Sequence, residues 1–96
     1  MLVLVTYDVN TTSTKGKVRL RKIAKHCCNY GQRVQNSVFE CDLDNAQYIA
    51  FKKELLELAD LKKDSVRFYN LGRHYSSRIE HYGVKETYDP EGNLIL

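Results

Sequence analysis

The sequence predicts an α+β fold in which two helices cover one face of a four-stranded antiparallel sheet. Periodic segments occur in the order strand, helix, hairpin, helix, strand, which is typical of the split βαβ arrangement. A chain of 96 residues with 43% hydrophobic content provides one core but not two. We therefore expect a single domain over residues 1–96, with residues 72–96 as a C-terminal extension at a dimer interface.

The first strand is predicted over residues 2–9, where a continuous apolar run rich in Val indicates burial on both faces. Such a strand belongs at the centre of the sheet. Residues 10–14, Asn-Thr-Thr-Ser-Thr, are turn formers and N-cap residues. They are expected to end the strand and begin a helix.

The first helix is predicted to be amphipathic, with a cationic outer face. At about 100° per residue, the apolar face consists of Leu20, Ile23, Ala24, Cys27 and Tyr30. The opposite face is expected to carry Lys15, Arg19, Arg21, Lys22, Lys25 and His26. Gly31 is expected to end the helix as a left-handed cap.

A hairpin is predicted after the first helix. Residues 32–43 alternate between polar and apolar types, but twelve residues are long for one strand. Asn36 and Ser37 are turn formers near the middle of this segment, so we expect them to divide it into two short strands.

The second helix is predicted over residues 45–59. Asp44 and Gln47 have the spacing of a capping box at its start. Its core face is expected to consist of Tyr48, Phe51, Leu55, Leu58 and Ala59. A last strand is predicted over residues 64–72, with Val66 and Phe68 on one face.

Helices on one side leave the other face of the sheet bare, and a second copy is expected to cover it. The segment after residue 72 has no clear period until the apolar end at residues 94–96. That end is expected to add a strand, either to its own sheet or to a partner subunit.

Positive charge is concentrated in the first part of the chain. Residues 1–40 contain seven Lys or Arg against two acids, a net charge of +5, and the other 56 residues contain eight against ten, a net charge of −2. This asymmetry indicates an anionic partner, of which nucleic acid is the commonest. An acidic membrane surface is the alternative.

Composition argues against several other classes of protein. The apolar run at residues 1–5 is far shorter than the roughly 20 residues of a membrane span, and no cationic segment precedes it, so we expect a cytoplasmic protein. Cys27, Cys28 and Cys41 form an odd set without C-x-x-C spacing. They favour neither a disulfide framework nor a zinc site.

Asp8 is the only carboxylate among the first 39 residues and lies at the end of the first strand, just before the cationic helix. A lone acid in this position indicates a metal or phosphate site. The alternative is that Asp8 merely caps the loop that follows the strand.

Three segments read VTYDV at residues 5–9, RVQNSVFE at residues 33–40 and DSVRFY at residues 64–69. Their order and spacing resemble those of the CRISPR-associated Cas2 family, whose members are adaptation proteins of CRISPR systems. The resemblance covers roughly residues 1–72. It implies a ferredoxin-like βαββαβ sandwich that forms a symmetric homodimer with facing sheets. It also implies partnership with the integrase Cas1 in spacer capture, and metal-dependent nuclease activity on RNA or DNA.

The resemblance also implies roles for individual residues. Asp8 matches the family's metal-site aspartate, Tyr7 its neighbour, Arg33 the basic residue before the hairpin and Phe39 the aromatic residue after it. Some members place Arg on the first helix, where this chain has Lys15 and Lys17; the charge is kept but the bidentate guanidinium is lost. With the helix cations Arg19 and Arg21, the expected nucleic-acid contacts are Tyr7, Lys15, Lys17, Arg19, Arg21, Arg33 and Phe39.

The resulting hypothesis is a metal-dependent endonuclease. Mg²⁺, or Mn²⁺ in its place, usually takes one or two carboxylates and keeps several waters, so two Asp8 side chains related by a twofold axis would make a better site than one. Arg33 and the helix cations would then position the phosphates. Two alternatives remain open: a non-catalytic dimeric adaptor that holds duplex DNA between integrase subunits, and a ribonuclease toxin on the same fold.

Overall fold

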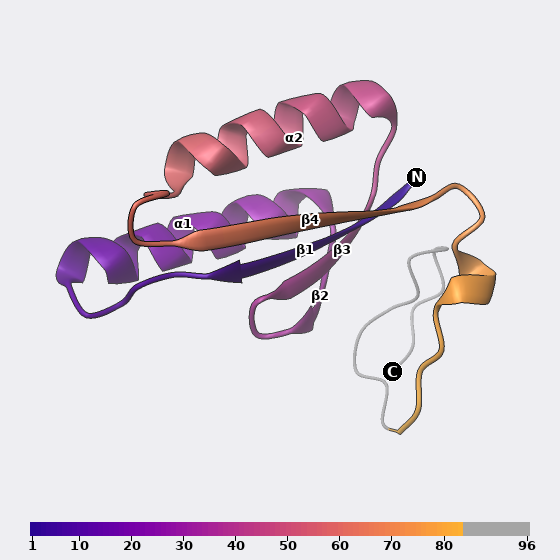
Figure 1. Ribbon diagram of the computed structural model, residues 1–96, viewed down its shortest axis with the longest axis horizontal. Coiled ribbons are helices and arrows are strands. Elements are labelled where there is room, and N and C mark those ends of the chain that lie inside the picture. The colour runs from indigo at the N-terminus through magenta and orange to yellow at the C-terminus, as the bar shows by residue number, and fades with distance from the viewer. Residues whose placement is uncertain (84–96) are drawn as a thin grey trace.

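The computed structural model describes residues 1–83, which form one α+β unit (Figure 1). Its elements are β1 (Leu2–Asp8), α1 (Thr14–Tyr30), β2 (Gln32–Gln35), β3 (Val38–Asp42), α2 (Asn45–Leu58), β4 (Ser65–Gly72) and the 3-10 turn η1 (Ser76–Arg78). This order confirms the predicted strand, helix, hairpin, helix, strand. The predicted C-terminal strand at residues 94–96 lies outside the described residues.

The four strands form one sheet in the order β2-β3-β1-β4, and every neighbouring pair is antiparallel. The central strand β1 pairs with both β3 and β4, so Val5 lies opposite Phe39 on one side and Phe68 on the other. This strand order, with helices after β1 and β3, is the ferredoxin-like arrangement that the family resemblance implies.

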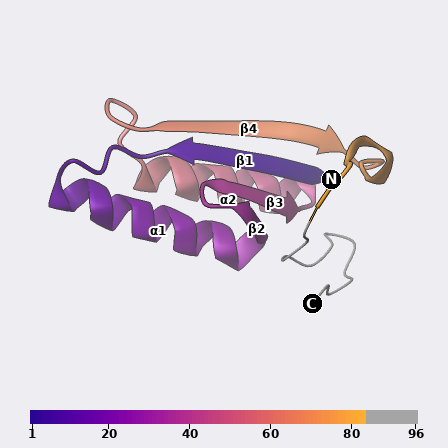
Figure 2. The same cartoon turned by 90° about the horizontal axis from the view of Figure 1, so that it is seen from below.

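Both helices lie on the same face of the sheet, and the other face has no helix over it (Figures 1 and 2). The core fills the space between the helices and the sheet. Its largest fully buried side chains on that side are Val3, Val5, Ile23, Cys27, Phe39, Cys41, Phe51 and Leu55. The alternation of β1 directs Val3, Val5 and Tyr7 into this core, and Leu4, Thr6 and Asp8 toward the uncovered face.

Polar side chains fix both helix starts. The Ser13 hydroxyl accepts a hydrogen bond from the Gly16 backbone N–H, as expected for an N-cap residue in the segment 10–14. Asp44 and Gln47 form the predicted capping box, in which each side chain accepts from the other residue's backbone N–H. The two-residue connection Asn36-Ser37 divides the hairpin as predicted.

The prediction of a left-handed cap at Gly31 is wrong. Gly31 has φ −161° and ψ −161°, an extended conformation that leads directly into β2. Its lack of a side chain serves close packing instead, because a Cβ there would lie 2.3 Å from the Glu40 carbonyl oxygen and 2.5 Å from the Cys41 Sγ. Glycine at this position lets the end of α1 lie against β3.

Arg19 and His26 do not lie on the outer face of α1 as predicted. The His26 ring stacks on Phe51, with ring centroids 5.2 Å apart, and its Nε2 lies 3.1 Å from the Phe51 carbonyl oxygen. His26 Nδ1 lies 3.6 Å from a carboxylate oxygen of Glu54. Arg19 and His26 both lie at the edge of the apolar stripe of α1. Their side chains bend toward the core, where they contact Asp64 and Phe51 respectively.

The described chain after β4 turns across the end of the sheet remote from Asp8 (Figure 1). Tyr75 is buried, and its hydroxyl lies 3.3 Å from Asp42 at the end of β3. Arg78 donates to the Leu71 carbonyl oxygen. Among the helices of residues 1–83, none has the length and apolar character needed to cross a membrane.

Candidate functional site

Asp8 is the last residue of β1, and its side chain is exposed on the uncovered face of the sheet. The two flanking residues, Tyr7 and Val9, are 5% and 8% exposed. In the antiparallel register Asp8 lies opposite Ser65, the first residue of β4. An exposed carboxylate is thus attached to backbone that is anchored on both sides.

The predicted group of Asp8, Tyr7, Arg33 and Phe39 does not come together on one face. Phe39 is fully buried in the core, and the Tyr7 ring stacks against it with centroids 6.2 Å apart. The Arg33 guanidinium carbon lies 5.2 Å from the centroid of the Phe39 ring. Cross-strand partners share a sheet face, so Arg33, paired with Phe39, lies on the face opposite Asp8.

The predicted nucleic-acid contacts of Tyr7 and Phe39 stay predictions, but both side chains lie in the core of this chain. Their rings belong to the core, because residues 7 and 39 fall on the inward phase of β1 and β3. The Tyr7 hydroxyl donates a hydrogen bond to the Asn36 carbonyl oxygen. Burial raises the pKa of Tyr7 above its ordinary value, with a smaller raising effect from the Cys27 thiol, so the phenol is protonated at neutral pH. Arg33 is exposed, and its contact with nucleic acid stays a prediction.

Arg19 has a structural partner. Its Nε donates to Asp64 Oδ2 at 2.8 Å and its Nη2 to Asp64 Oδ1 at 3.1 Å. The Arg19 side chain is 16% exposed and the Asp64 side chain 0% exposed. Two such bonds give the Arg19 guanidinium a role in holding the fold together, and its contact with nucleic acid stays a prediction.

Asp64 is the residue that sequence reasoning missed. It is the only buried charged residue among residues 1–83, and its carboxylate also accepts from the backbone N–H groups of Asn10 and Asp60. The bond from Arg19 and these backbone donors hold the pKa of Asp64 down, at about 2, against the opposing effect of burial. The sequence placed Asp64 at the start of a strand, but gave no signal for a partner 45 positions away.

The remaining cations of α1 form an exposed surface, which we call the cationic face. It consists of Lys15, Lys17, Arg21, Lys22 and Lys25. The helix contains no acid to neutralise them, since Asp8 and Glu40 are the only carboxylates among the first 40 residues. The four lysines of this face can bind phosphates as separate point charges. Arg21 is the one residue of the face whose planar guanidinium can form bidentate bonds to a phosphate.

One chain supplies a sparse set of metal ligands. Within residues 1–83, no three His, Cys, Asp or Glu side chains are grouped so that they could hold a metal ion. The exposed Asp8 side chain offers two hard carboxylate oxygens to solvent. Such a donor fits Mg²⁺, which keeps several waters and takes one or two carboxylates, and it does not fit a fully protein-enclosed Ca²⁺ or Zn²⁺ site.

The three cysteines are all free thiols, and Cys27 and Cys41 are buried. Burial raises the pKa of each buried thiol to about 12, so both are protonated at neutral pH and are poor ligands and nucleophiles. Cys28 is exposed on α1.

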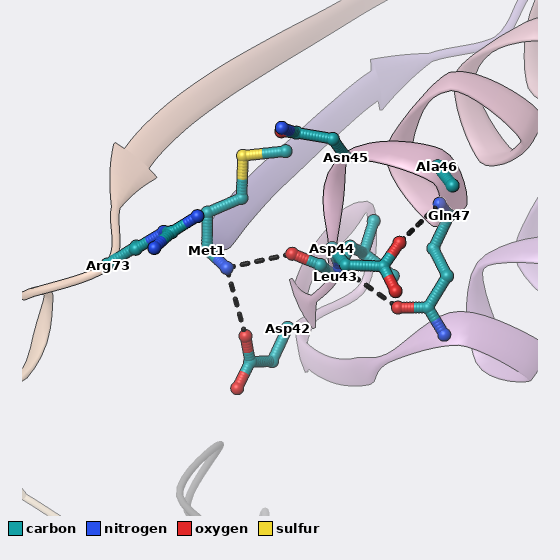
Figure 3. A pocket seen from close by; sticks show the side chains of 8 residues that line it. All are labelled: Met1, Asp42, Leu43, Asp44, Asn45, Ala46, Gln47 and Arg73. Carbon is teal, nitrogen blue, oxygen red and sulfur yellow. Dashed lines mark hydrogen bonds and ion pairs between the residues drawn. The ribbon is translucent and has the colours of Figure 1, made fainter.

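An open pocket of about 660 Å³ lies at the other end of the sheet (Figure 3). It is lined by Met1, Asp42, Leu43, Asp44, Asn45, Ala46, Gln47 and Arg73. Several of its polar groups bond to each other: the Met1 amino group donates to the Leu43 carbonyl oxygen at 2.8 Å, and the capping box occupies the start of α2. Asp8 stands at the far end of the seven-residue strand β1, roughly 20 Å away, so the pocket is separate from the Asp8 site.

Comparisons with known proteins agree with this fold. The family model described as CRISPR associated protein Cas2 matches residues 1–79. The "CRISPR-associated endoribonuclease Cas2" of Chlorobaculum tepidum is 59% identical over 96 residues, covering all of both chains. The "CRISPR-associated endonuclease Cas2" of Halalkalibacterium halodurans is 57% identical, also over all of both chains.

A solved structure is similarly close. The crystal structure of Streptococcus pyogenes Cas2 at pH 6.5 superposes with a TM-score of 0.75 at 53% sequence identity. The match covers 86% of this chain and all of that one. Because the family model spans most of the chain and the relatives span all of it, this chain belongs to the CRISPR-associated protein Cas2 family.

Proposed function

We propose that this chain is a metal-dependent endonuclease that cleaves phosphodiester bonds of nucleic acid and takes part in spacer acquisition for antiviral defence. Duplex DNA is the favoured substrate and RNA a second one. The observation that carries the proposal is the exposed Asp8 carboxylate at the end of β1, in a chain whose close relatives are named endonuclease and endoribonuclease.

A symmetric homodimer is part of the proposal. The uncovered face of the sheet carries apolar and aromatic side chains, including Leu4 and the 40%-exposed Tyr69. A second copy placed on this face would bury them and complete a two-sided core. Asp8 lies on the same face, so a twofold axis near the ends of the two β1 strands would bring two carboxylates together.

Each group then has a defined role. Bound Mg²⁺, or Mn²⁺ in its place, would neutralise charge on a phosphoryl oxygen and lower the pKa of a coordinated water. Asp8 holds the ion through its carboxylate oxygens. Lys15, Lys17 and Arg21 bind the phosphate backbone on either side of the scissile bond, which fixes the strand without reading its sequence.

The test uses the parent, Asp8→Ala and Asp8→Asn proteins with matched RNA and duplex DNA, with and without Mg²⁺, after sedimentation confirms that all are dimers. We expect cleavage by the parent to require Mg²⁺ and to fall by at least about 100-fold in both variants. Asp42→Asn is the matched control, because Asp42 is a half-exposed carboxylate on the same sheet face at its other end. Full activity of Asp8→Asn in Mg²⁺ would remove Asp8 from the mechanism.

A non-catalytic adaptor is the second candidate function, and the sparse ligand set favours it. With no group of three metal-binding side chains in the described part of the chain, the cationic face and the dimer are enough to hold duplex DNA between Cas1 integrase subunits. The adaptor predicts that Asp8→Ala and parent support spacer integration equally, and that EDTA leaves DNA binding unchanged. A ribonuclease toxin, the third candidate, predicts cleavage of RNA but not of duplex DNA.

A further inference from the structure

The Asp64 carboxylate joins three segments that are far apart in the sequence. It accepts hydrogen bonds from the Arg19 side chain in α1, from the Asn10 N–H in the β1–α1 loop at 3.0 Å, and from the Asp60 N–H after α2 at 2.9 Å. Its side chain is 0% exposed. A buried carboxylate with so many donors has one well-defined position. If it moved away from any donor, the free-energy cost of its desolvation would no longer be compensated by a hydrogen bond.

These contacts fix the loop that begins at Asp8. Asn10, two residues beyond Asp8, is held by its N–H on Asp64, while its side-chain oxygen accepts from the Thr12 N–H and hydroxyl. The Asn10 carbonyl oxygen lies against Gly16 so closely that a Cβ there would be 1.9 Å from it. The loop is thus pressed onto the first turn of α1.

The same contacts link Asp8 to the cationic face. Arg19 fixes α1 to Asp64 one turn after Lys15, and Asp64 is followed directly by Ser65, the cross-strand partner of Asp8. The carboxylate that would hold the metal and the cations that would hold phosphates are therefore attached to one rigid unit. A displacement of about 1 Å between such groups can cost about 100-fold in rate.

We infer that Asp64 is a positioning residue, which fixes the Asp8 carboxylate relative to the cationic start of α1. This inference rests on the proposed function, because it assigns Asp64 a role in metal binding and turnover at the Asp8 site. The Asp64 side chain is 0% exposed and bonds to α1, so this role would be exerted through its protein partners and not by direct contact with an ion or substrate.

The first experiment measures Asp64→Asn, Asp8→Asn and the double variant as purified dimers. Asparagine keeps the shape of Asp64 but loses the charge and one acceptor oxygen. We expect Asp64→Asn to bind Mn²⁺, titrated alone and followed by electron paramagnetic resonance, about 10-fold more weakly and to turn over about 10-fold more slowly. Amide exchange at Asn10 is expected to accelerate by a similar factor.

Stability is controlled with Asp44→Ala, which removes the N-cap of α2 at the other end of the molecule and leaves the Asp8 region untouched. The two variants are compared at a temperature where both are fully folded by circular dichroism. If Asp64→Asn does not fold, the pair Arg19→Gln with Asp64→Asn removes both charges and leaves no unpaired buried ion. The pair is expected to give the same weakening of Mn²⁺ binding.

The double variant separates positioning from general destabilisation. If Asp64 acts through Asp8, Asp8→Asn with Asp64→Asn has the same Mn²⁺ affinity and rate as Asp8→Asn alone, because the group being positioned is already gone. Losses that multiply would overturn the inference, as would Mn²⁺ affinity and turnover in Asp64→Asn within twofold of Asp44→Ala. Parent-like turnover in Asp8→Asn would instead overturn the proposed function, and the positioning role with it.

Discussion

Asp8 and Asp64 are two carboxylates with opposite environments, although both lie at the same end of the sheet. Asp8 is exposed on the uncovered face and keeps its oxygens available to solvent. Asp64 is buried on the helix side, where donors from three segments use its oxygens. In the proposed function the exposed acid takes part in the chemistry and the buried acid in the architecture, and only exposure and partners distinguish them.

The lowered pKa of Asp64 predicts a specific pH dependence of stability. The folded-state pKa of about 2 lies below the unfolded value of 3.8, so folding favours the ionised form. The contribution is complete above the unfolded pKa and is lost as pH falls from about 4 to about 2. Asp64→Asn is therefore expected to lower the free energy of unfolding by about 2 kcal/mol at pH 7.

That difference is measured by urea unfolding of both proteins between pH 7 and pH 2. It should be constant down to about pH 5 and shrink at lower pH, as the parent loses the advantage of its carboxylate. Other acids titrate equally in both proteins and cancel. An equal difference at pH 7 and pH 2 would contradict the assignment of the shift to Asp64.

At the scale of elements, α1 carries two functions on two sides. One side carries the buried residues Gly16, Ile23 and Cys27, of which Gly16 lies against the loop after β1. The other side is the cationic face. Glycine inside a helix normally costs stability, so its presence at position 16 needs a packing reason, and the close approach of Asn10 supplies one.

Gly16→Ala is expected to destabilise the protein by roughly 1–3 kcal/mol, because the new methyl group meets the Asn10 carbonyl oxygen. On helix propensity alone, the same change would stabilise by about 1 kcal/mol. The sign of the change in the free energy of unfolding, measured by denaturant titration, therefore shows which effect is larger. Asn29→Ala, at an exposed position of α1, is the control and should be neutral or slightly stabilising.

The cationic face predicts sequence-independent, salt-sensitive binding of duplex DNA. If a dimer neutralises about six phosphates, log K falls against log salt concentration with a slope near −5. Each position occurs twice in a dimer, so Lys15→Gln should make the slope less negative by about 2. Fluorescence anisotropy with two unrelated duplexes measures both the slope and its independence of sequence.

Lys53→Gln is the control for that measurement, since Lys53 is exposed on α2 rather than on the cationic face. It should change the slope little. A flat salt response in the parent, or equal effects of Lys15→Gln and Lys53→Gln, would mean that α1 does not carry the phosphate contacts.

At the scale of the whole molecule, the one-sided covering of the sheet predicts the oligomeric state. Leu4→Lys introduces a charge on the uncovered face, and we expect it to convert a dimer into a monomer because the charge would be buried at the interface. Ile49→Lys is the control, since Ile49 is 67% exposed on α2, away from that face. Sedimentation velocity distinguishes the two states, and a dimeric Leu4→Lys protein would place the interface elsewhere.

Much of the fold follows from local patterns. The period of the apolar residues located the strands and both helices, and the spacing of Asp44 and Gln47 marked the start of α2. The exposure of a side chain at the edge of a helix's apolar stripe was not predictable from local sequence. Arg19 is an example, because its partner Asp64 lies 45 residues later in the chain. Phe39 was likewise assigned to nucleic acid, whereas its phase in β3 places it in the core.

The central position of β1 has a mechanical consequence for Asp8. Pairing with β3 restrains Leu2 to Thr6 on one edge of this strand, and pairing with β4 extends along the other edge to Asp8. The backbone of Asp8 therefore shifts only if part of the sheet opens. If Asp8 acts as proposed, adjustment at the carboxylate would come from bending or unstacking of the nucleic acid.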